Sequence, residues 1–189
     1  MSGNTLWNFF ANCINTNANT FRANAGVYGK VYFPRLTTPI SNVLSSMIRF
    51  AIQTILVLMF MVYFLFHGAV APNWGAWVMI PVELVHLGIL GMGFGIIISS
   101  MTTKYRDLTI LVDFGVQAWM YLTPVVYPLS TLSDGWMKDI LMINPVTSAV
   151  EMLRYAILGK GTLDWGYYGL SWAVTLAVAI LGIMIFNKI

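Results

Sequence analysis

Three long runs of apolar residues limit what this chain can fold into more than any other feature of its sequence. The runs cover residues 40–66, 76–101 and 166–186. Each reaches or exceeds the roughly 20 apolar residues that a helix needs to cross the hydrocarbon core of a bilayer. Because 58% of all residues are hydrophobic and only 9% are charged, little of the chain is left for a soluble domain. The sequence therefore predicts an all-α, polytopic helical membrane protein.

Two other segments are weaker candidates for a span. Residues 108–129 are long enough, but Pro124 and Pro128 each remove a backbone donor and clash with the preceding turn, so the span is expected to break there. On a helix, residues 5–22 and the position just before them would form a polar stripe, made of Asn4, Asn8, Asn12, Asn15 and Asn19. Such a helix could cross the membrane if its carboxamides faced protein or a water-filled path.

The distribution of Lys and Arg orients the predicted spans, since cytoplasmic loops carry an excess of these residues. Six of the ten gather at one end of the spans, at Arg22, Lys30, Arg35, Lys104, Arg106 and Lys188. The exception is the mixed-charge region 130–165, where Lys138, Arg154 and Lys160 lie among four acidic residues. Residues 68–75 contain none. We therefore expect residues 24–36, residues 102–107 and the C-terminus inside, with residues 68–75 and 130–165 outside. The net charge of +3 is too small and too scattered to indicate nucleic-acid binding.

The outer region contains the signals of one complete short helix, NPVTSAVEMLRYAILGKG. Asn144 suits the N-cap, Pro145 the first helical position and Gly159 the C-terminal stop. Glu151 and Arg154 lie three positions apart and could pair on the helix surface. The helix is too short to span. Together with the broken segment TPVVYP it predicts either a re-entrant element in the outer leaflet or an interfacial amphipathic helix packed on the bundle.

Three ionisable residues inside the predicted spans are functional candidates, because such groups are costly in lipid. Glu83 and His86 lie three positions apart on one helix and could pair with each other. A proton relay or a metal site is conceivable, but two ligands without a third favour a structural or channel-lining role. Asp113 could instead meet Lys104 or Arg106 near the inner side.

Several other patterns point to packing rather than to chemistry. Gly91 and Gly95 form a GxxxG pair inside an apolar helix, which favours close helix packing over dinucleotide binding. Arg49 lies near the inner third of its span and could extend to the inner surface. The segment LGKGT lacks the upstream glycine of a Walker A motif. No nucleophile–base pair and no carboxylate pair stands out, so we expect neither catalysis nor a metal site.

Four segments, in this order, resemble the ABC-2 type permeases that export polysaccharides such as O-antigen, capsule and teichoic acid. VYGKVYFPRLTTPISNVL resembles their first cytoplasmic loop and KYRDL their second. TPVVYP and NPVTSAVEMLRYAILG resemble their outer region. The resemblance covers nearly the whole chain. It implies an ABC-2 permease fold of the type V exporter kind, in the cytoplasmic (inner) membrane of a bacterium or archaeon.

The resemblance also implies partners. In that family the permease is a homodimer surrounded by membrane lipid, and each copy works with an ABC ATP-binding subunit. A lipid-linked glycan passes through a tunnel between the two copies. This chain would bind no cofactor, because ATP and Mg belong to the partner subunit. Closure of that subunit would push a short cytoplasmic coupling helix, and two outer re-entrant helices would gate the exit.

Family roles transfer to four groups of residues. The residues expected to couple to the ATPase are Val27, Tyr28, Lys30, Val31, Tyr32, Phe33, Pro34 and Arg35. Those of the second cytoplasmic loop are Lys104, Tyr105, Arg106 and Asp107. Those of the outer gate are Pro124, Pro128, Asn144, Pro145, Glu151 and Arg154. Possible channel-lining residues, whose rings and amides suit sugars, are Asn8, Asn12, Asn15, Asn19, Trp119, Tyr121 and Tyr127.

Each assignment has an alternative. The coupling segment could be an aromatic–basic anchor that touches only lipid headgroups, and the channel-lining residues could serve ordinary helix packing. Relatives have six spans, with an amphipathic helix and one span ahead of residues 5–22 and a charged tail after the last span. We therefore expect a truncated copy. The alternative functions are an ABC-2 permease for drugs or lipids, a non-functional fragment, and an intramembrane enzyme that uses Glu83, His86 and Asp113.

Overall fold

The three long apolar runs form the longest helical segments of the computed structural model, which describes residues 2–28, 30, 34, 36–105 and 107–188. They are α3 (Thr37–Phe66), the continuous pair η1 (Trp74–Val78) and α4 (Met79–Thr102), and α8 (Trp165–Lys188). Among the described residues, these three segments are long and apolar enough to cross a membrane. The same residues contain helices and no strand, which confirms the predicted fold class.

The remaining elements are shorter. They are α1 (Ser2–Ala18), α2 (Thr20–Tyr28), α5 (Leu108–Tyr121), η2 (Leu129–Thr131), α6 (Trp136–Ile143) and α7 (Pro145–Leu158). Helix α5 ends at Tyr121, well before the expected limit at residue 129. The physical reason lies in the sequence, because a proline disfavours helical backbone at the residue before it and cannot itself continue the hydrogen-bond ladder. Residues 122–128 therefore leave the helix as a chain of turns.

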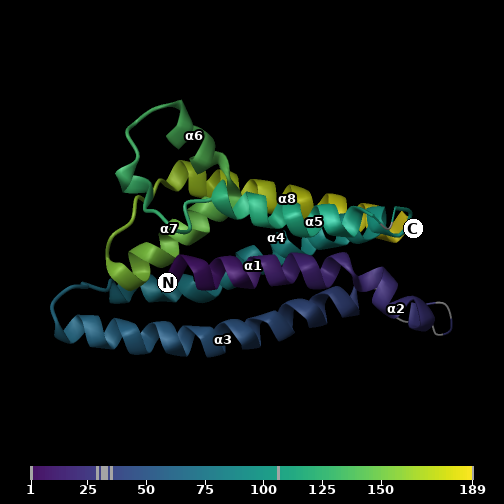
Figure 1. Ribbon diagram of the computed structural model, residues 1–189, viewed down its shortest axis with the longest axis horizontal. Helices are drawn as coiled ribbons and strands as arrows, with labels where there is room; N and C mark the ends of the chain where they lie inside the picture. Colours follow the sequence, from purple (N-terminus) through teal and green to yellow (C-terminus); the bar gives the residue numbers. More distant parts are fainter. Residues whose placement is uncertain (1, 29, 31–33, 35, 106, 189) are drawn as a thin grey trace.

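The long helices lie side by side, so that their ends gather at two opposite ends of the molecule (Figure 1). The C-terminus, α2 and the junction of α4 with α5 are at one end. Helices α6 and α7 and the loop after α3 are at the other end, together with the beginning of α1. The loops expected inside thus lie at one end, and those expected outside lie at the other.

Helix α4 occupies the centre because its glycines let two neighbours approach closely. A Cβ atom added to Gly91 would lie 2.7 Å from Cβ of Cys13 on α1. One added to Gly93 would lie 3.2 Å from the backbone nitrogen of Ala179 on α8. Gly95 meets α1 in the same way, with the carbonyl oxygen of Ile14 2.9 Å from the position of its missing Cβ. The GxxxG pair is therefore a packing face, as predicted, and its partner is α1.

Helix α1 presents its apolar face to this centre. Leu6, Phe10, Cys13 and Ile14 are at most 1% exposed, although the helix was the least apolar of the predicted spans. A helix with a polar stripe is thus fully packed on its apolar side. Close packing against α4 accounts for its position, because helices in a bilayer associate through van der Waals contacts and interhelical hydrogen bonds rather than through removal of apolar surface from water.

We predict that Gly95→Ala destabilises the bundle, because its new methyl group would overlap Asn17 and the carbonyl oxygen of Ile14 on α1. Overpacking of this kind costs about 1–3 kcal/mol. Thermal denaturation of the purified protein in detergent measures it as a lower Tm. Gly115→Ala is the matched control, because no atom lies within 4 Å of its added Cβ. Equal Tm values for Gly95→Ala and the wild type would contradict the close α1–α4 contact.

Candidate functional site

The outer end of the bundle is organised around α7, whose limits follow the signals in its sequence. The side chain of Asn144 accepts a hydrogen bond from the backbone nitrogen of Val146 at 3.1 Å, and Pro145 occupies the first turn. Gly159 ends the helix with a left-handed φ of 67°, a conformation that glycine adopts without strain. The predicted N-cap and C-cap are therefore confirmed.

Arg154 of α7 holds the segment that the prolines release from α5. Its Nη2 atom donates to the carbonyl oxygens of Pro124 and Val125, each at 3.1 Å, and its Nη1 atom approaches that of Tyr127 at 3.5 Å. Backbone carbonyls that leave a helix need new donors when water is excluded. A guanidinium group offers five donors in a fixed plane, so one side chain can serve several carbonyls.

Glu151 completes this cluster. Its Oε1 atom accepts from Arg154 Nη1 at 2.6 Å, and its Oε2 atom accepts from the backbone nitrogen of Thr162 at 3.3 Å. The predicted pair is confirmed, but its predicted place on the helix surface is wrong. The two side chains are 3% and 10% exposed, because the segment after α5 and the loop after α7 cover them.

The other predicted gate residues differ in their contacts. Asn144 also donates to Thr123 Oγ1 at 2.9 Å, so α7 is tied at both ends to the turn after α5. The carbonyl oxygen of Pro145 accepts from Ser171 on α8 at 2.8 Å. Pro128 is exposed at the start of η2. Apolar and polar positions of α7 are buried alike, which fits an inserted element better than an interfacial amphipathic helix.

Helix α6 lies outside this cluster, at the outer edge of the molecule (Figure 1). Trp136 is 72% exposed there. Lys138 donates to Asp134 at 2.6 Å, and this hydrogen bond lowers the pKa of the Asp134 carboxyl from its ordinary value. An exposed pair of this kind adds little to stability, so α6 depends on its apolar contacts.

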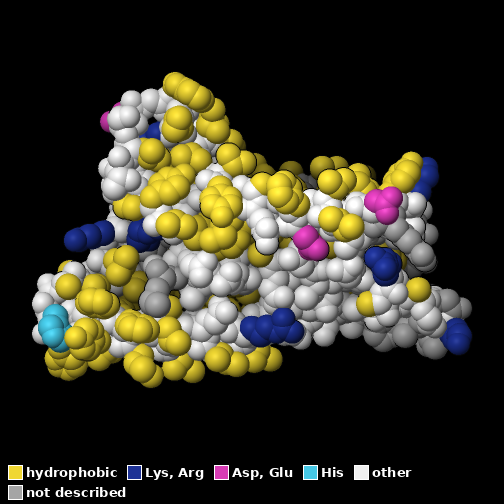
Figure 2. Space-filling view, viewed as in Figure 1, with side chains coloured by type: hydrophobic (Ala, Val, Ile, Leu, Met, Phe, Trp, Pro, Cys, Tyr) yellow, Lys and Arg dark blue, Asp and Glu magenta, His cyan; other side chains and the backbone are white. Residues whose placement is uncertain are grey.

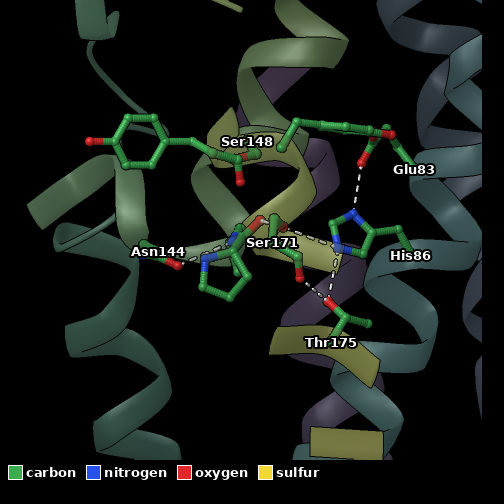
Figure 3. A network of polar contacts seen from close by, with 10 residues as sticks. Glu83, His86, Asn144, Ser148, Ser171 and Thr175 are labelled. Carbon is green, nitrogen blue, oxygen red and sulfur yellow. Dashed lines mark hydrogen bonds and ion pairs between the residues drawn. The ribbon is translucent and has the colours of Figure 1, made fainter. Parts of the chain in front are cut away.

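A second buried polar cluster lies beneath α7, between α4 and α8 (Figure 3). His86 Nδ1 is 3.1 Å from Glu83 Oε2, and the other carboxylate oxygen accepts from the hydroxyl of Tyr168 at 2.6 Å. His86 Nε2 faces Thr175 Oγ1 at 2.8 Å and Ser171 Oγ at 3.1 Å. The predicted Glu83–His86 pair is confirmed, and both residues are fully buried.

The hydroxyl groups fix one proton of this cluster. Ser171 donates its proton to the carbonyl oxygen of Pro145, and Thr175 donates to the carbonyl oxygen of Ser171. Both hydroxyls must therefore accept from His86 Nε2, which carries a proton. His86 Nδ1 and Glu83 Oε2 would repel each other if both carried only lone pairs, so a second proton lies between these two atoms.

Sequence reasoning missed the α8 half of this cluster. Tyr168, Ser171 and Thr175 recur at helical spacing and are at most 9% exposed in an otherwise apolar helix, a periodic polar signal that could have identified them. The ring of Trp172 stacks on His86 with centroids 4.4 Å apart. Asp113 is exposed on α5 and takes no part in the network. The three-residue site of an intramembrane enzyme therefore does not form.

The predicted channel-lining residues fall into two groups. Trp119 is half-buried and packs edge-on against Phe10, with centroids 5.4 Å apart, which fits the packing alternative. Tyr121 is 80% exposed, and Tyr127 is half-buried. The asparagines lie on the side of α1 away from its apolar face, where Asn8 and Asn19 are exposed and Asn12 and Asn15 are half-buried.

The two cytoplasmic loops are described only in part. Val31, Tyr32, Phe33, Arg35 and Arg106 lie outside the described residues, as does the side chain of Val27. The ring of Tyr28 lies 6.0 Å from that of Phe21 at the end of α2, and Lys30 and Pro34 are exposed. Tyr105 and Asp107 are exposed, and so is Lys104, whose ammonium group lies 5.4 Å from the centre of the Tyr105 ring.

Comparison with known proteins places these features in a family. The family model for ABC-2 type transporters matches residues 1–158. The chain is 27% identical over 183 residues to the O-antigen export system permease protein RfbA of Klebsiella pneumoniae, which covers 97% of this chain and 68% of that protein. It is 26% identical over 145 residues to the protein of the same name from Myxococcus xanthus, which covers 75% of this chain and 53% of that protein.

We predict that Arg154→Met loosens the outer end, because it leaves Glu151 and the carbonyls of Pro124 and Val125 without their donor. Removing one partner of a buried ion pair costs about 3–5 kcal/mol. Limited proteolysis at residues 122–135 should become faster and Tm should fall. Lys138→Gln removes an equal charge from an exposed pair and should change neither. A protease-resistant Arg154→Met protein would show that other groups hold the segment.

The shared-proton cluster predicts an asymmetry between two substitutions. Glu83→Gln should leave Tm nearly unchanged, because the amide can donate to His86 Nδ1 while its oxygen still accepts from Tyr168. His86→Leu should cost more than about 2 kcal/mol, since it removes the partner of the buried Oε2 atom of Glu83 and the group that faces both hydroxyls of α8. Thermal denaturation of both variants measures the difference. Similar losses in both would refute the proton assignment.

Proposed function

The chain belongs to the ABC-2 type transporter family, and we propose that it is the membrane-spanning permease of an ATP-driven exporter of lipid-linked polysaccharide. It is a multi-pass membrane transport subunit. The observation that carries the substrate class is the match to permeases named for O-antigen export, which extends over 97% of this chain. The cargo would be a glycan of the O-antigen, capsule or teichoic-acid type, moved across the inner membrane.

Energy would enter at the end of the bundle that holds α2 and the α4–α5 junction. There an ABC ATP-binding subunit would contact residues 27–35 and residues 104–107, with ATP and Mg bound on that subunit. Helix α2 offers a route into the bundle, since Phe21 packs on Phe186 of α8 with centroids 4.6 Å apart. The backbone nitrogen of Phe21 also donates to Ser99 of α4 at 3.1 Å. A push on α2 would thus reach both central helices.

The outer cluster supports a gate at the opposite end. Arg154 ties α7 to the turn after α5, and Ser171 ties α7 to α8. Movement of α7 would therefore strain its hydrogen bonds to the turn after α5 and to α8. A switch between a closed and an open arrangement needs such discrete contacts, because binding energy can then favour one arrangement over the other. We propose that a second copy of the chain completes the tunnel.

We predict that the double variant Tyr32→Ala, Phe33→Ala uncouples the exporter. Aromatic anchors dominate the energy of protein interfaces, so stimulation of the ATPase by the permease should fall at least about tenfold while the permease stays in the membrane. Cells that carry the variant should accumulate lipid-linked polymer on the cytoplasmic side. ATPase assays on the co-purified complex and fractionation of the lipid-linked glycan measure the two effects.

Trp74→Ala is the matched control, because Trp74 is an exposed aromatic residue at the opposite end. It should leave ATPase stimulation intact. Persistent stimulation in the double variant would refute the coupling assignment. Failure of lipid-linked polymer to accumulate when the whole protein is lost would refute the polysaccharide cargo, and would favour export of a drug or a lipid.

A further inference from the structure

A polar hollow lies between α1 and α3, away from both clusters described above. It has a volume of about 220 Å³ and is lined by Asn8, Asn12, Arg49 and Gln53 together with the rings of Phe9 and Phe50. The polar groups that face it come from helices that pack on each other through a ladder of hydrogen bonds. Asn42 of α3 donates to Asn17 at 3.2 Å, and Asn12 of α1 donates to Ser46 at 3.0 Å.

Among the described residues, Arg49 is the one charged group that lines this hollow, and it lies well away from either end of the bundle. It follows the first residue of α3 by twelve positions, which corresponds to about 18 Å along the helix axis. Its Nη1 atom donates to Asn12 Oδ1 on α1 at 3.1 Å. The guanidinium is therefore held sideways by a neighbouring helix rather than extended to the inner surface, which corrects the sequence expectation for this residue.

The charge of Arg49 has no carboxylate partner in the described residues. The sequence contains no Asp or Glu before Glu83, so α1 has no charged side chain and α2 and α3 carry basic charge alone. Glu83 is fully buried in its own network. Figure 2 shows basic atoms midway along α3, with hydrophobic side chains between them and the end of that helix at the left, and no acidic atoms beside them. An arginine at this depth costs about 2.5–3.5 kcal/mol or more, so a compensating group is expected.

We infer that the hollow binds the phosphate group that joins the glycan to its lipid carrier. This inference rests on the proposed export of a lipid-linked glycan and names the part of that cargo which this face recognises. Arg49 uses one guanidinium donor for Asn12, which leaves the others for phosphate oxygens. A planar guanidinium matches phosphate geometry in a bidentate manner. The amides of Asn8 and Gln53 are exposed beside it and can donate as well.

The surroundings fit the two other parts of such a ligand. Ile52, Ile55 and Met59 of α3 are 62–69% exposed, so an acyl or prenyl chain can lie against this helix in the bilayer. The asparagine stripe extends from the hollow toward both ends of α1, through Asn4 and Asn19. Neutral amides can exchange hydrogen bonds with phosphate or sugar oxygens without holding them tightly. A charged head could thus move along α1 while its tail stays in lipid.

Direct binding to the full chain tests this inference without the ATPase. The probe is farnesyl diphosphate, added to the purified protein in nanodiscs of zwitterionic lipid, with farnesol as the uncharged comparison. Tryptophan fluorescence titration gives Kd for the wild type, Arg49→Gln, Arg49→Lys and Lys188→Gln. Lys188→Gln is the matched control, because it removes one exposed basic charge at the end of α8. Gln53→Leu changes the lining of the hollow and leaves Arg49 unsubstituted.

We expect Arg49→Gln to weaken farnesyl diphosphate binding by about tenfold or more, as for loss of one charge-assisted hydrogen bond. Arg49→Lys and Gln53→Leu should weaken farnesyl diphosphate binding by a smaller factor. Lys188→Gln should bind it with the wild-type Kd, and the Kd for farnesol should be the same for every protein. Equal Kd values of Arg49→Gln and the wild type for farnesyl diphosphate would overturn the inference. Binding of farnesyl diphosphate no tighter than that of farnesol to the wild type would also overturn it. If Arg49→Gln misfolds, the same criterion applies to Gln53→Leu.

Two further outcomes distinguish phosphate binding from pairing between copies and from the proposed export. If Arg49 instead pairs with Asp113 of a second copy, Arg49→Asp should break the dimer and Arg49→Asp combined with Asp113→Arg should restore it, which would overturn the phosphate site. If lipid-linked polymer does not accumulate on loss of the protein but Arg49-dependent diphosphate binding persists, the proposed function is refuted while the anion-binding site is supported. The two proposals can therefore fail independently.

Discussion

A buried carbonyl or carboxylate with no water beside it must find its donor within the protein, and this requirement shapes the outer half of the bundle. The prolines after α5 free several carbonyls at once, and Arg154 of α7 serves them. The position of α7 then brings Pro145 within reach of Ser171, so the lower cluster of Glu83 and His86 joins the upper one through a single hydroxyl. Four helices are thus connected by a chain of polar contacts that would be too costly to leave unpaired.

Much of this arrangement could be predicted from the sequence because it depends on local signals. The apolar runs predicted the spans, Asn144, Pro145 and Gly159 predicted the limits of α7, and the Glu83–His86 and Gly91–Gly95 spacings predicted contacts on one helix face. The remaining features depend on which helices meet. The partners of Arg154 are backbone carbonyls, which every residue carries, so no residue type pointed to them. Hydropathy likewise ranked α1 last among the spans, although its apolar side is almost completely buried.

Two arginines, Arg154 at the outer end and Arg49 midway along the bundle, illustrate how the same side chain can serve different purposes. Arg154 is enclosed, has a carboxylate partner and uses its donors on fixed groups of the protein, so it acts as a structural clamp. Arg49 bonds to one neutral amide and keeps exposed donors in a polar hollow. The first arrangement stabilises one conformation, whereas the second leaves binding capacity unused. The contrast in partners, rather than residue type, supports a cargo role for the second arginine alone.

The central place of α1 has a consequence for how the protein is made. Helix α1 precedes α3 and α4 in the chain, yet its buried face and Asn12 of its polar stripe make their contacts with those later helices. When α1 leaves the ribosome, neither of these two partners has been synthesised. The contacts that hold α1 in the bundle can therefore form only after α4 has been synthesised. The first helix of the described chain is thus among the last to gain its final neighbours.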